Sequence, residues 1–366
     1  MSQTKSAAAG KPLQLIFILP DLEAGGAERI VTTLANNLPR AYFQPKIMLM
    51  RKEGPYLAFL QDDVEVIDLR VKRIRSSLFP ILREIRKRQP DIVFSGFGEV
   101  NAYLSPFIRL FPKTKFIARE TNVVSEHVTR RSIRFFYKFY PSYHRIICQS
   151  DDMKNDLLSN FKLKEKKLIK INNPVDFDFI ENQLEGQEQP VVYNGGQKNI
   201  VAVGNLSARK GFDNLLRVFA HLKDENIHLH ILGNGADKEK LLTLQKELGL
   251  QKIFFHGQQS NPYPYLKFAD AFVLSSRYEG FPNVLLEAGA CGTIAVANNC
   301  PGGITEIIED GINGYTGNID DHTAFAELIK KVLDEPGNSV RIKESIHRRF
   351  SLPVILTQYE KALLSL

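Results

Sequence analysis

The sequence predicts an α/β protein with two doubly wound domains, each built on a parallel sheet. Short apolar runs recur along all 366 residues, helical patterns separate them, and glycine-containing turns follow several runs. A polar stretch at 184–198 interrupts the alternation once. We therefore expect domains at 12–183 and 199–350 on either side of a linker, with one more helical segment at 351–366.

The clearest strand signals are the apolar runs at Leu13–Leu19 and Ala271–Leu274, and the helix expected at 27–38 has apolar residues on one face. In the first half, the predicted strands are Leu13–Leu19, 44–50, 64–69, 91–95, Lys115–Arg119 and 145–149. The helices there are expected at 27–38, 56–61, Leu78–Arg88, 100–110, 132–140 and 151–158.

The second half repeats the same alternation. Its predicted strands are 199–203, Ile227–Leu232, 252–256, Ala271–Leu274 and 292–297. Its helices are expected at 212–222, 238–248, 323–333, 340–346 and Leu352–Leu364, and another helix begins with Pro282 in its first turn. Two facing domains of this type form a cleft, which is a usual place for a ligand.

The net charge of +7 is unevenly distributed. Residues 1–183 carry 30 Lys and Arg against 20 Asp and Glu, whereas residues 184–366 carry 18 against 21. The first half therefore suits an anionic partner such as a membrane surface, a phosphorylated substrate or nucleic acid, although a solvated basic face remains an alternative.

Cysteine content and hydropathy favour a cytoplasmic protein. The three cysteines, Cys148, Cys291 and Cys300, have no metal-ligand spacing, so we expect no metal site and a reducing compartment. Residues 1–11 lack the apolar core of a signal peptide, and no run reaches the roughly 20 apolar residues of a membrane span.

Basic residues gather in two places in the first half. They are Arg70, Lys72, Arg73, Arg75, Arg83, Arg86, Lys87 and Arg88, then Arg130, Arg131, Arg134 and Lys138 among Phe135, Phe136, Tyr137, Phe139 and Tyr140. Basic and aromatic residues together are typical of a helix at a bilayer interface or of nucleic-acid binding. Because no nucleic-acid-binding module accompanies them, we favour the membrane; aromatics in the core with arginines in solvent remain the alternative.

The most informative stretch is 275–289, which follows an apolar strand and leads into a helix. Ligands of open α/β sheets bind at the carboxyl ends of strands, and the amino ends of helices attract anions. Two carboxylates, Glu279 and Glu287, frame the stretch. If all eight residues were helical, the two would stand ~12 Å apart at ~1.5 Å per residue, too far for a glycosidase acid/base pair.

Other loops have the character of phosphate sites. The 204–211 loop combines terminal glycines with Arg209 and Lys210, although it lacks the Walker A order. Gly25 and Gly26 form a turn between strand and helix, and Gly302 and Gly303 could bring further N–H groups to the same cleft. The Gly233-Asn234-Gly235 turn lacks the third glycine of a dinucleotide fingerprint, so we do not expect NAD.

These motifs make nearly the whole chain resemble a retaining glycosyltransferase of the GT-B superfamily, of the family 4 type (glycosyl transferases group 1). The Glu-x7-Glu motif from Glu279 to Glu287 is the most specific element. The segments 20–28, 203–212 and 302–314 also resemble the family. The resemblance implies a GT-B fold, two Rossmann-like domains with the active site in the cleft between them. The N-terminal domain would bind the acceptor, and the C-terminal domain would bind the donor nucleotide. The C-terminal helix would pack back on the first domain.

The resemblance also implies roles for individual residues. Lys210 would neutralise the donor diphosphate, Glu279 would contact the transferred sugar, and Glu287 would contact the ribose. The donor would further meet Gly25, Gly26, Asn205, Arg209, Gly280, Phe281, Pro282, Asn283 and Val284. No metal or cofactor is implied, since cations and helix ends would stabilise the leaving group.

Two positions depart from the family pattern. Asn205 stands where many relatives have Arg, and Glu120 stands where many have His. Glu120 is therefore a catalytic and acceptor-binding candidate, together with Asn122 and His127.

The expected reaction is transfer of a sugar from a nucleoside-diphosphate sugar, with UDP as the favoured nucleotide. The expected acceptor is a lipid-linked or cell-envelope glycan of the polysaccharide, O-antigen or lipopolysaccharide type. The reaction would take place at the inner face of the cytoplasmic membrane, without nucleic acid. A nucleotide-sugar epimerase and an inactive glycan-binding subunit are the alternatives.

Overall fold

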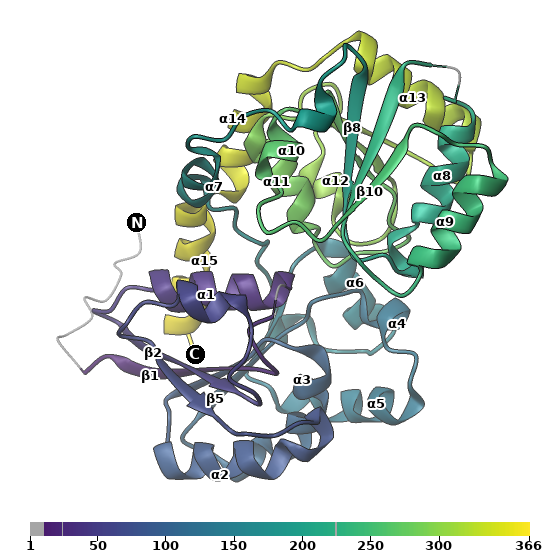
Figure 1. Ribbon diagram of the computed structural model, residues 1–366. Helices are drawn as coiled ribbons and strands as arrows, with labels where there is room; N and C mark the ends of the chain where they lie inside the picture. Colours follow the sequence, from purple (N-terminus) through teal and green to yellow (C-terminus); the bar gives the residue numbers. More distant parts are fainter. Residues whose placement is uncertain (1–10, 24, 224) are drawn as a thin grey trace. The chain divides into compact units, whose positions relative to one another are not determined.

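The computed structural model describes residues 11–23, 25–223 and 225–366, which form two compact units (Figure 1). The first unit runs to Cys148 and also contains Lys154–Ile171 and Leu356–Leu366. The second contains Gln149–Met153 and Asn172–Ile355. Residues 1–10, for which we expect no signal peptide, lie outside the described residues.

In the described part of the chain, the sheet of the first unit has seven parallel strands in the order β3-β2-β1-β4-β5-β6-β7. The strands are β1 Leu13–Leu19, β2 Phe43–Leu49, β3 Glu65–Asp68, β4 Ile92–Ser95, β5 Lys115–Arg119, β6 Arg145–Cys148 and β7 Leu168–Lys170. The chain moves outward from β1 to β3 and then crosses to β4. The strand order therefore reverses between β1 and β4, which is where doubly wound sheets bind ligands.

The helices of the first unit cover both faces of this sheet, with α1 on one face and α2 and α3 on the other (Figure 1). They are α1 Gly26–Asn37, η1 Pro55–Phe59, η2 Ile74–Ser76, α2 Leu78–Arg88, α3 Gly98–Leu104, η3 Ser105–Leu110, α4 Val124–His127, α5 Arg131–Phe136, η4 Tyr137–Ser142, α6 Asp151–Ser159 and η5 Glu165–Lys167, where η marks a 3₁₀ helix. Because both faces are covered, consecutive strand residues such as Ile16, Phe17 and Ile18 are all buried.

In the described residues of the second unit, six parallel strands have the order β10-β9-β8-β11-β12-β13, with the reversal between β8 and β11. The strands are β8 Lys198–Val203, β9 Ile227–Leu232, β10 Ile253–Gly257, β11 Ala271–Leu274, β12 Ala295–Asn298 and β13 Gly314–Gly317. The helices are α7 Phe177–Leu184, η6 Val191–Tyr193, η7 Ala208–Lys210, α8 Phe212–Ala220, α9 Lys238–Glu247, α10 Tyr263–Lys267, α11 Asn283–Cys291, α12 Ile304–Ile307, α13 His322–Asp334 and α14 Ser339–Phe350, and α15 Leu352–Leu364 is shared with the first unit.

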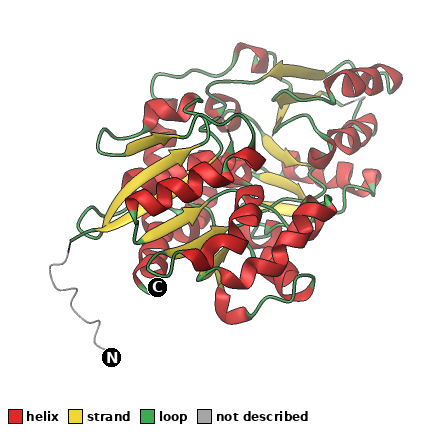
Figure 2. Cartoon of the chain, turned by 90° about the horizontal axis from the view of Figure 1, so that it is seen from below, coloured by secondary structure: helices red, strands yellow, loops and turns green. Residues whose placement is uncertain are grey.

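Alternate strand residues of the second unit pack into two separate hydrophobic cores, one on each face of the sheet. Ile200 and Ala202 of β8 join a cluster with α8, α9 and α13, whereas Val201 between them joins a cluster with α7, α10 and α11. Helices thus lie on both faces of the strands (Figure 2). The predicted class, two parallel-sheet α/β domains, is confirmed.

Prolines explain where predicted helices differ from the structure. The helix predicted over 100–110 divides into α3 and η3 beside Pro106, and the one over 132–140 divides into α5 and η4, which contains Pro141. The segment at 56–61 is a 3₁₀ helix that begins at Pro55. The short elements α4, β7, α10, α12 and β13 were not expected, and α7 and η6 occupy much of the segment from 177 to 193.

The last helix, α15, connects the two units along the chain. Its residues up to Ile355 belong to the second unit, and Leu356–Leu366 belong to the first. In the first unit, Tyr359 is fully buried, and its hydroxyl receives a hydrogen bond from Arg119 Nε at 3.2 Å. Arg119 ends β5, so this contact fixes the C-terminal residues near the carboxyl end of that strand.

Candidate functional site

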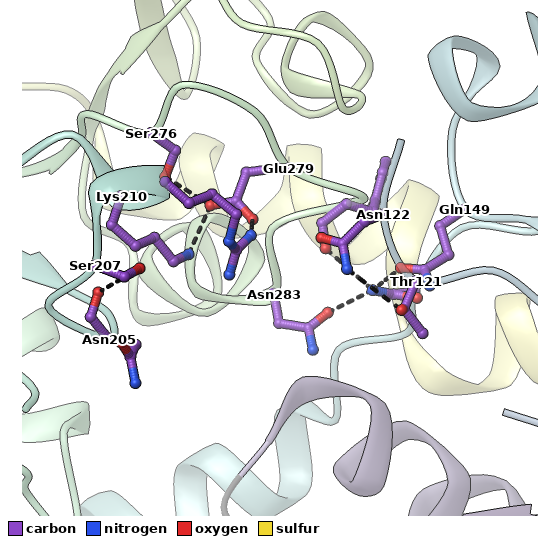
Figure 3. A network of polar contacts seen from close by, with 12 residues as sticks. Thr121, Asn122, Gln149, Asn205, Ser207, Lys210, Ser276, Glu279 and Asn283 are labelled. Carbon is purple, nitrogen blue, oxygen red and sulfur yellow. Dashed lines mark hydrogen bonds and ion pairs between the residues drawn. The ribbon is translucent and has the colours of Figure 1, made fainter. Parts of the chain in front are cut away.

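The loops that follow β8 and β11 leave adjacent strands at the point where the second sheet reverses its order. The loop after β8 carries Arg209 and Lys210, and the loop after β11 carries Glu279. Lys210 Nζ lies 2.6 Å from Glu279 Oε1, and Arg209 Nη1 lies 2.7 Å from Glu279 Oε2 (Figure 3). The sequence-predicted residues Arg209, Lys210 and Glu279 therefore form one cluster.

Glu279 is the buried centre of this cluster. Its side chain is 6% exposed, and Ser276 Oγ donates a further hydrogen bond to Oε1 at 2.6 Å. Burial alone would raise the pKa of Glu279, but Lys210 and Arg209 outweigh burial and the pKa lies below its usual value. The carboxyl is thus ionised at neutral pH, so it is suited to hold cations or accept hydrogen bonds and not to act as a general acid.

The cluster carries a net positive charge, because two cations share one carboxylate. The Lys210 and Arg209 side chains are 12% and 28% exposed, so solvent reaches both. The Arg209 guanidinium also lies 5.9 Å from the centre of the Tyr278 ring. A partly desolvated pair of cations beside a loop that enters α8 is chemically suited to a diphosphate.

Asn205 belongs to the same loop but is not part of the ion cluster. It is exposed, and its backbone carbonyl accepts a hydrogen bond from Ser207 N at 2.8 Å. The Gly233–Gly235 turn supports this end of the loop, since Leu206 N donates to Asn234 O at 2.9 Å. A Cβ at Gly235 would lie 2.3 Å from Leu206 O, so the turn needs glycine to pack against the loop.

Pro282, which was expected in the first turn of the helix, stands directly before it. Pro282 is the N-cap, with an extended backbone at ψ 104°, and α11 starts at Asn283. Glu279 therefore precedes the helix, and the separation of ~12 Å that assumed eight helical residues to Glu287 does not apply. Glu287 itself lies inside α11 and is buried.

The residues at the start of α11 are held by amide side chains. Asn283 Oδ1 accepts a hydrogen bond from Asn173 Nδ2 at 2.7 Å, and the same nitrogen lies 2.9 Å from Gln149 Oε1 (Figure 3). Asn173 Nδ2 also donates to Phe281 O at 3.1 Å. Gly280, Phe281 and Pro282 are buried and Val284 is half-buried, so of the predicted donor residues in this segment only the Asn283 and Val284 side chains are partly open.

Gly302 and Gly303 have a different surrounding from the one expected. Asp152 Oδ2 accepts hydrogen bonds from both of their N–H groups, at 2.8 and 3.0 Å. Gly302, at φ +126°, packs against Glu279, whose N–H donates to Pro301 O at 2.8 Å. The expectation that these N–H groups face the ligand is therefore wrong in this structure: a carboxylate already occupies them, and the loop supports Glu279.

The first unit contains a cavity of about 440 Å³ beside the loops that follow β4 and β5. Glu120, Asn122 and His127, the predicted acceptor residues, all line it. Apolar residues such as Phe97, Val124 and Ile133 line it as well, together with the charged Glu99 and Arg130, so its wall is mixed. A mixed wall with a few polar groups is typical of a small-molecule site.

Glu120 is a buried carboxyl in the wall of this cavity. Oε1 accepts from Tyr140 Oη at 2.6 Å and from Asn101 Nδ2 at 3.2 Å, and Oε2 accepts from Tyr137 Oη at 3.4 Å. The two tyrosine rings stack with centroids 4.1 Å apart. Burial raises the pKa of Glu120, and these hydrogen bonds oppose the shift. Tyr137, Tyr140 and Asn101 were not among the predicted site residues.

Gly25 and Gly26 adjoin a carboxylate of their own helix. Gly25 is the N-cap of α1, and a Cβ there would lie 2.0 Å from Glu28 Oε2. Glu28 is buried, and burial raises its pKa. A side chain at position 25 would therefore displace the Glu28 carboxylate, and the role of Gly25 and Gly26 at donor phosphates stays a prediction.

The basic and aromatic segment of α5 and η4 divides between core and surface. Tyr137 and Tyr140 are buried, as the alternative interpretation had it, whereas Phe135 and Phe139 are 51% and 38% exposed. These two phenylalanines pack edge to face at 5.8 Å. The cations around them are exposed: Arg130, Arg131, Arg134 and Lys138.

Outside residues 1–10, 24 and 224, no helix is long and apolar enough to cross a membrane. The same part of the chain contains no group of three or more His, Cys, Asp or Glu side chains arranged to hold a metal ion.

Family models match both halves of the chain. Residues 24–179 match the model described as Glycosyltransferase Family 4, and residues 185–349 match Glycosyl transferases group 1. The N-acetylgalactosamine-N,N'-diacetylbacillosaminyl-diphospho-undecaprenol 4-alpha-N-acetylgalactosaminyltransferase of Campylobacter jejuni is 29% identical over 348 residues, which cover 87% of this chain and 90% of that protein. The lipopolysaccharide core biosynthesis glycosyltransferase LpsD of Rhizobium meliloti is 23% identical, with coverage of 92% and 94%.

Solved structures share the fold along almost the whole chain. The Anabaena protein HepE in complex with UDP-glucose superposes with a TM-score of 0.81 at 17% identity, covering 97% of this chain and all of that one. A glycosyltransferase from Rickettsia africae superposes with a TM-score of 0.79 at 20% identity, covering 96% and 98%. These structures show that the chain has the GT-B fold, and the two family matches, which together span most of its length, show that it belongs to the family 4 glycosyltransferases (glycosyl transferases group 1).

Proposed function

We propose that this protein transfers a hexose-type sugar from a UDP-sugar to a lipid-linked or cell-envelope glycan, with retention of configuration and without a metal ion. The observation that carries the donor half is the pair of cations, Arg209 and Lys210, on the ionised carboxylate of Glu279. It lies at the carboxyl ends of β8 and β11, the point where such sheets bind ligands. The Anabaena relative of similar fold is described in complex with UDP-glucose.

Each residue of the cluster has a distinct role in this proposal. Lys210 and Arg209 stabilise the negative charge that develops on the diphosphate as the sugar leaves. Glu279 holds both cations and accepts a hydrogen bond from a hydroxyl of the transferred sugar. Glu287, buried in α11, contacts the ribose. The acceptor hydroxyl attacks from the face of the leaving group, and the departing phosphate takes its proton, so the anomeric configuration is retained.

The acceptor half of the proposal rests on the cavity in the first unit. Glu120 presents a buried, hydrogen-bonded carboxyl at its wall, which suits a sugar hydroxyl, and Asn122 and His127 line the same cavity. The similar proteins of Campylobacter jejuni and Rhizobium meliloti are described as acting on a diphospho-undecaprenol glycan and in lipopolysaccharide core biosynthesis. Exposed Phe135 and Phe139 among cations support a peripheral position on the inner face of the cytoplasmic membrane.

A donor panel tests the proposal. The protein is incubated with individual UDP-, GDP- and ADP-sugars, with and without extracted membrane lipids, and nucleotide release is measured. We expect release from a UDP-sugar that rises when lipids are added and persists in excess EDTA. Release from none of the donors would refute the transferase proposal, interconversion of the sugar without release would indicate an epimerase, and EDTA-sensitive release would refute metal independence. The anomeric signals of the product in a proton NMR spectrum test retention.

A further inference from the structure

The segment 275–277 holds the backbone of the cationic loop through three successive carbonyl groups. Arg277 Nη1 donates to Ala208 O, Arg277 N donates to Arg209 O at 2.8 Å, and Ser275 Oγ donates to Lys210 O at 2.8 Å. Every carbonyl of η7, from Ala208 to Lys210, is therefore turned toward this segment.

The direction of these carbonyls matters for an anion. A backbone carbonyl carries partial negative charge on its oxygen, so a carbonyl facing a phosphate would repel it. With the three oxygens held by Ser275 and Arg277, the loop is left to present cationic side chains, and both of them converge on Glu279. Residues 275–279, outside the loop, thus contact both the backbone and the side chains of Arg209 and Lys210.

Arg277 is itself fixed by an acidic partner. Its Nη1 and Nη2 donate to Asp213 Oδ1 and Oδ2 at 2.8 and 2.7 Å, which is the bidentate geometry that only arginine offers a carboxylate. Asp213 lies in the first turn of α8, directly after the loop. The glycine between loop and helix completes the arrangement, since at Gly211, with φ +63°, a Cβ would lie 2.1 Å from Ser275 O.

We infer that Arg277 is a positioning residue for the donor diphosphate: its guanidinium holds Ala208 O at the start of η7, which orients the loop so that Arg209 and Lys210 face the phosphates. The inference rests on the proposed function, because it concerns the same donor site. It differs from a direct contact, since the Arg277 guanidinium is engaged by Asp213 and Ala208 O.

The test uses three variants of the full-length protein and a matched control. Arg277→Gln removes the positive charge and the bidentate ion pair with Asp213. Arg277→Lys keeps the charge but cannot form the bidentate pair. Asp213→Asn weakens the pair and leaves Arg277 unchanged. Lys240→Gln is the control, because Lys240 lines the same small cavity as Arg277 and Asp213 and is 82% exposed, paired with Asp237. The probes are UDP and inorganic pyrophosphate by isothermal titration calorimetry, and uridine by saturation-transfer NMR.

We expect Arg277→Gln and Arg277→Lys to weaken UDP and pyrophosphate binding about tenfold or more and Asp213→Asn about threefold, since misplaced charges lose much of their interaction. Uridine binding should be unchanged in all three, and Lys240→Gln should match the wild type. Equal loss of uridine affinity would indicate general unfolding and overturn the inference. Wild-type affinity in Arg277→Lys would also overturn the inference, because the positive charge alone would then suffice. Wild-type affinity in Asp213→Asn would overturn it too, because it would favour a direct contact between Arg277 and the phosphates.

The wild-type protein separates this inference from the proposed function. A wild type that binds neither UDP nor pyrophosphate refutes the donor site and the inference with it. A wild type that binds both, with affinity that Arg277→Gln does not change, refutes the inference alone and leaves the proposed function standing.

Discussion

Replacing Glu279 with glutamine should slow sugar transfer and at the same time tighten the binding of free UDP. Glutamine has nearly the same shape, so its Oε1 can still accept from Ser276 Oγ and Lys210 Nζ. Its amide nitrogen would then stand 2.7 Å from Arg209 Nη1, donor against donor, where Oε2 stands now. The variant therefore changes the charge of the site from +1 to +2 and breaks one contact.

UDP binding and sugar transfer should change in opposite directions, because the first depends on the bound phosphates alone and the second on the transition state with the sugar. A phosphate bound to Lys210 would lie ~6 Å from the Glu279 carboxylate, and at an effective dielectric constant of ~20 their repulsion is about 3 kcal/mol before salt screening. Screening leaves about 1–2 kcal/mol, so we expect UDP to bind roughly tenfold tighter to Glu279→Gln. Transfer loses the sugar contact and the fixed Arg209, so kcat/KM should fall about 100-fold, or about 2.7 kcal/mol.

Stability provides a third readout with a defined pH dependence. Removing one partner of a buried ion pair costs about 3–5 kcal/mol, and since solvent reaches Lys210 and Arg209 we expect the lower end. The pKa of Glu279 lies below its ordinary value of 4.5, so its stabilisation is present above that value. The stabilisation is lost as pH falls through the folded-state pKa. The gap in free energy of unfolding between wild type and Glu279→Gln should therefore be wide at pH 7 and narrow below pH 4.5.

The assays are coupled UDP release for kcat/KM, isothermal titration calorimetry for UDP, and urea unfolding for stability. Glu327→Gln is the matched control, because Glu327 forms an exposed ion pair with Lys330 in the same unit and such pairs are worth little. A folded Glu279→Gln protein that binds UDP no tighter than wild type would refute the charge argument. Wild-type turnover in that variant would remove Glu279 from the mechanism.

Three further predictions concern the cation, the buried carboxyl and the surface. Lys210→Ala should lower kcat/KM about 100-fold and, unlike Glu279→Gln, weaken UDP binding; wild-type values would exclude Lys210, and the exposed pair member Lys198→Ala is the control. Because burial raises the pKa of Glu120, its ionisation costs stability as pH rises through the folded-state pKa. The free energy of unfolding of Glu120→Gln, measured in urea, should therefore rise relative to that of the wild type between pH 5 and pH 8. A difference between the two proteins that is constant with pH would contradict this. The double change Phe135→Ser and Phe139→Ser should cut binding to phosphatidylglycerol vesicles about tenfold in a flotation assay. The similarly exposed Phe254→Ser of the other unit should not, and undiminished binding by the double variant would place any membrane contact elsewhere.

The strands and the charged loops could be predicted from sequence because their signals are local. The segments predicted as strands at Leu13–Leu19, Lys115–Arg119, Ile227–Leu232 and Ala271–Leu274 coincide with β1, β5, β9 and β11, since strands covered on both faces are rich in apolar residues. The glycines and cations of the 204–211 loop likewise stand next to each other in the sequence, so their chemistry could be recognised before their geometry was known.

Contacts between distant residues were beyond such reasoning. Tyr140 meets Glu120 across 20 residues, and Asp152 meets Gly302 across 150. In the sequence, Tyr140 is one aromatic residue in a basic segment, and nothing there distinguishes it from Phe139, which is exposed. A helical period could have separated them: α5 and η4 bury Ile133, Tyr137 and Tyr140 at spacings of four and three, and leave Phe135 and Phe139 outside.

Arg277 shows how a residue inside a recognised motif can still be overlooked. A reading of 275–289 as a ligand loop directs attention to Glu279 and Glu287, whose carboxylates can touch a substrate. Arg277 makes its contacts backward, to the carbonyls of Ala208 and Arg209 some 70 residues earlier in the chain. The two loops therefore act as one unit: the loop after β11 supplies both the counter-charge, through Glu279, and the backbone orientation, through Arg277, of the cations after β8. A substitution in either loop should change the charge that a diphosphate meets, which is why the UDP affinity of the Glu279 and Arg277 variants must move in opposite directions.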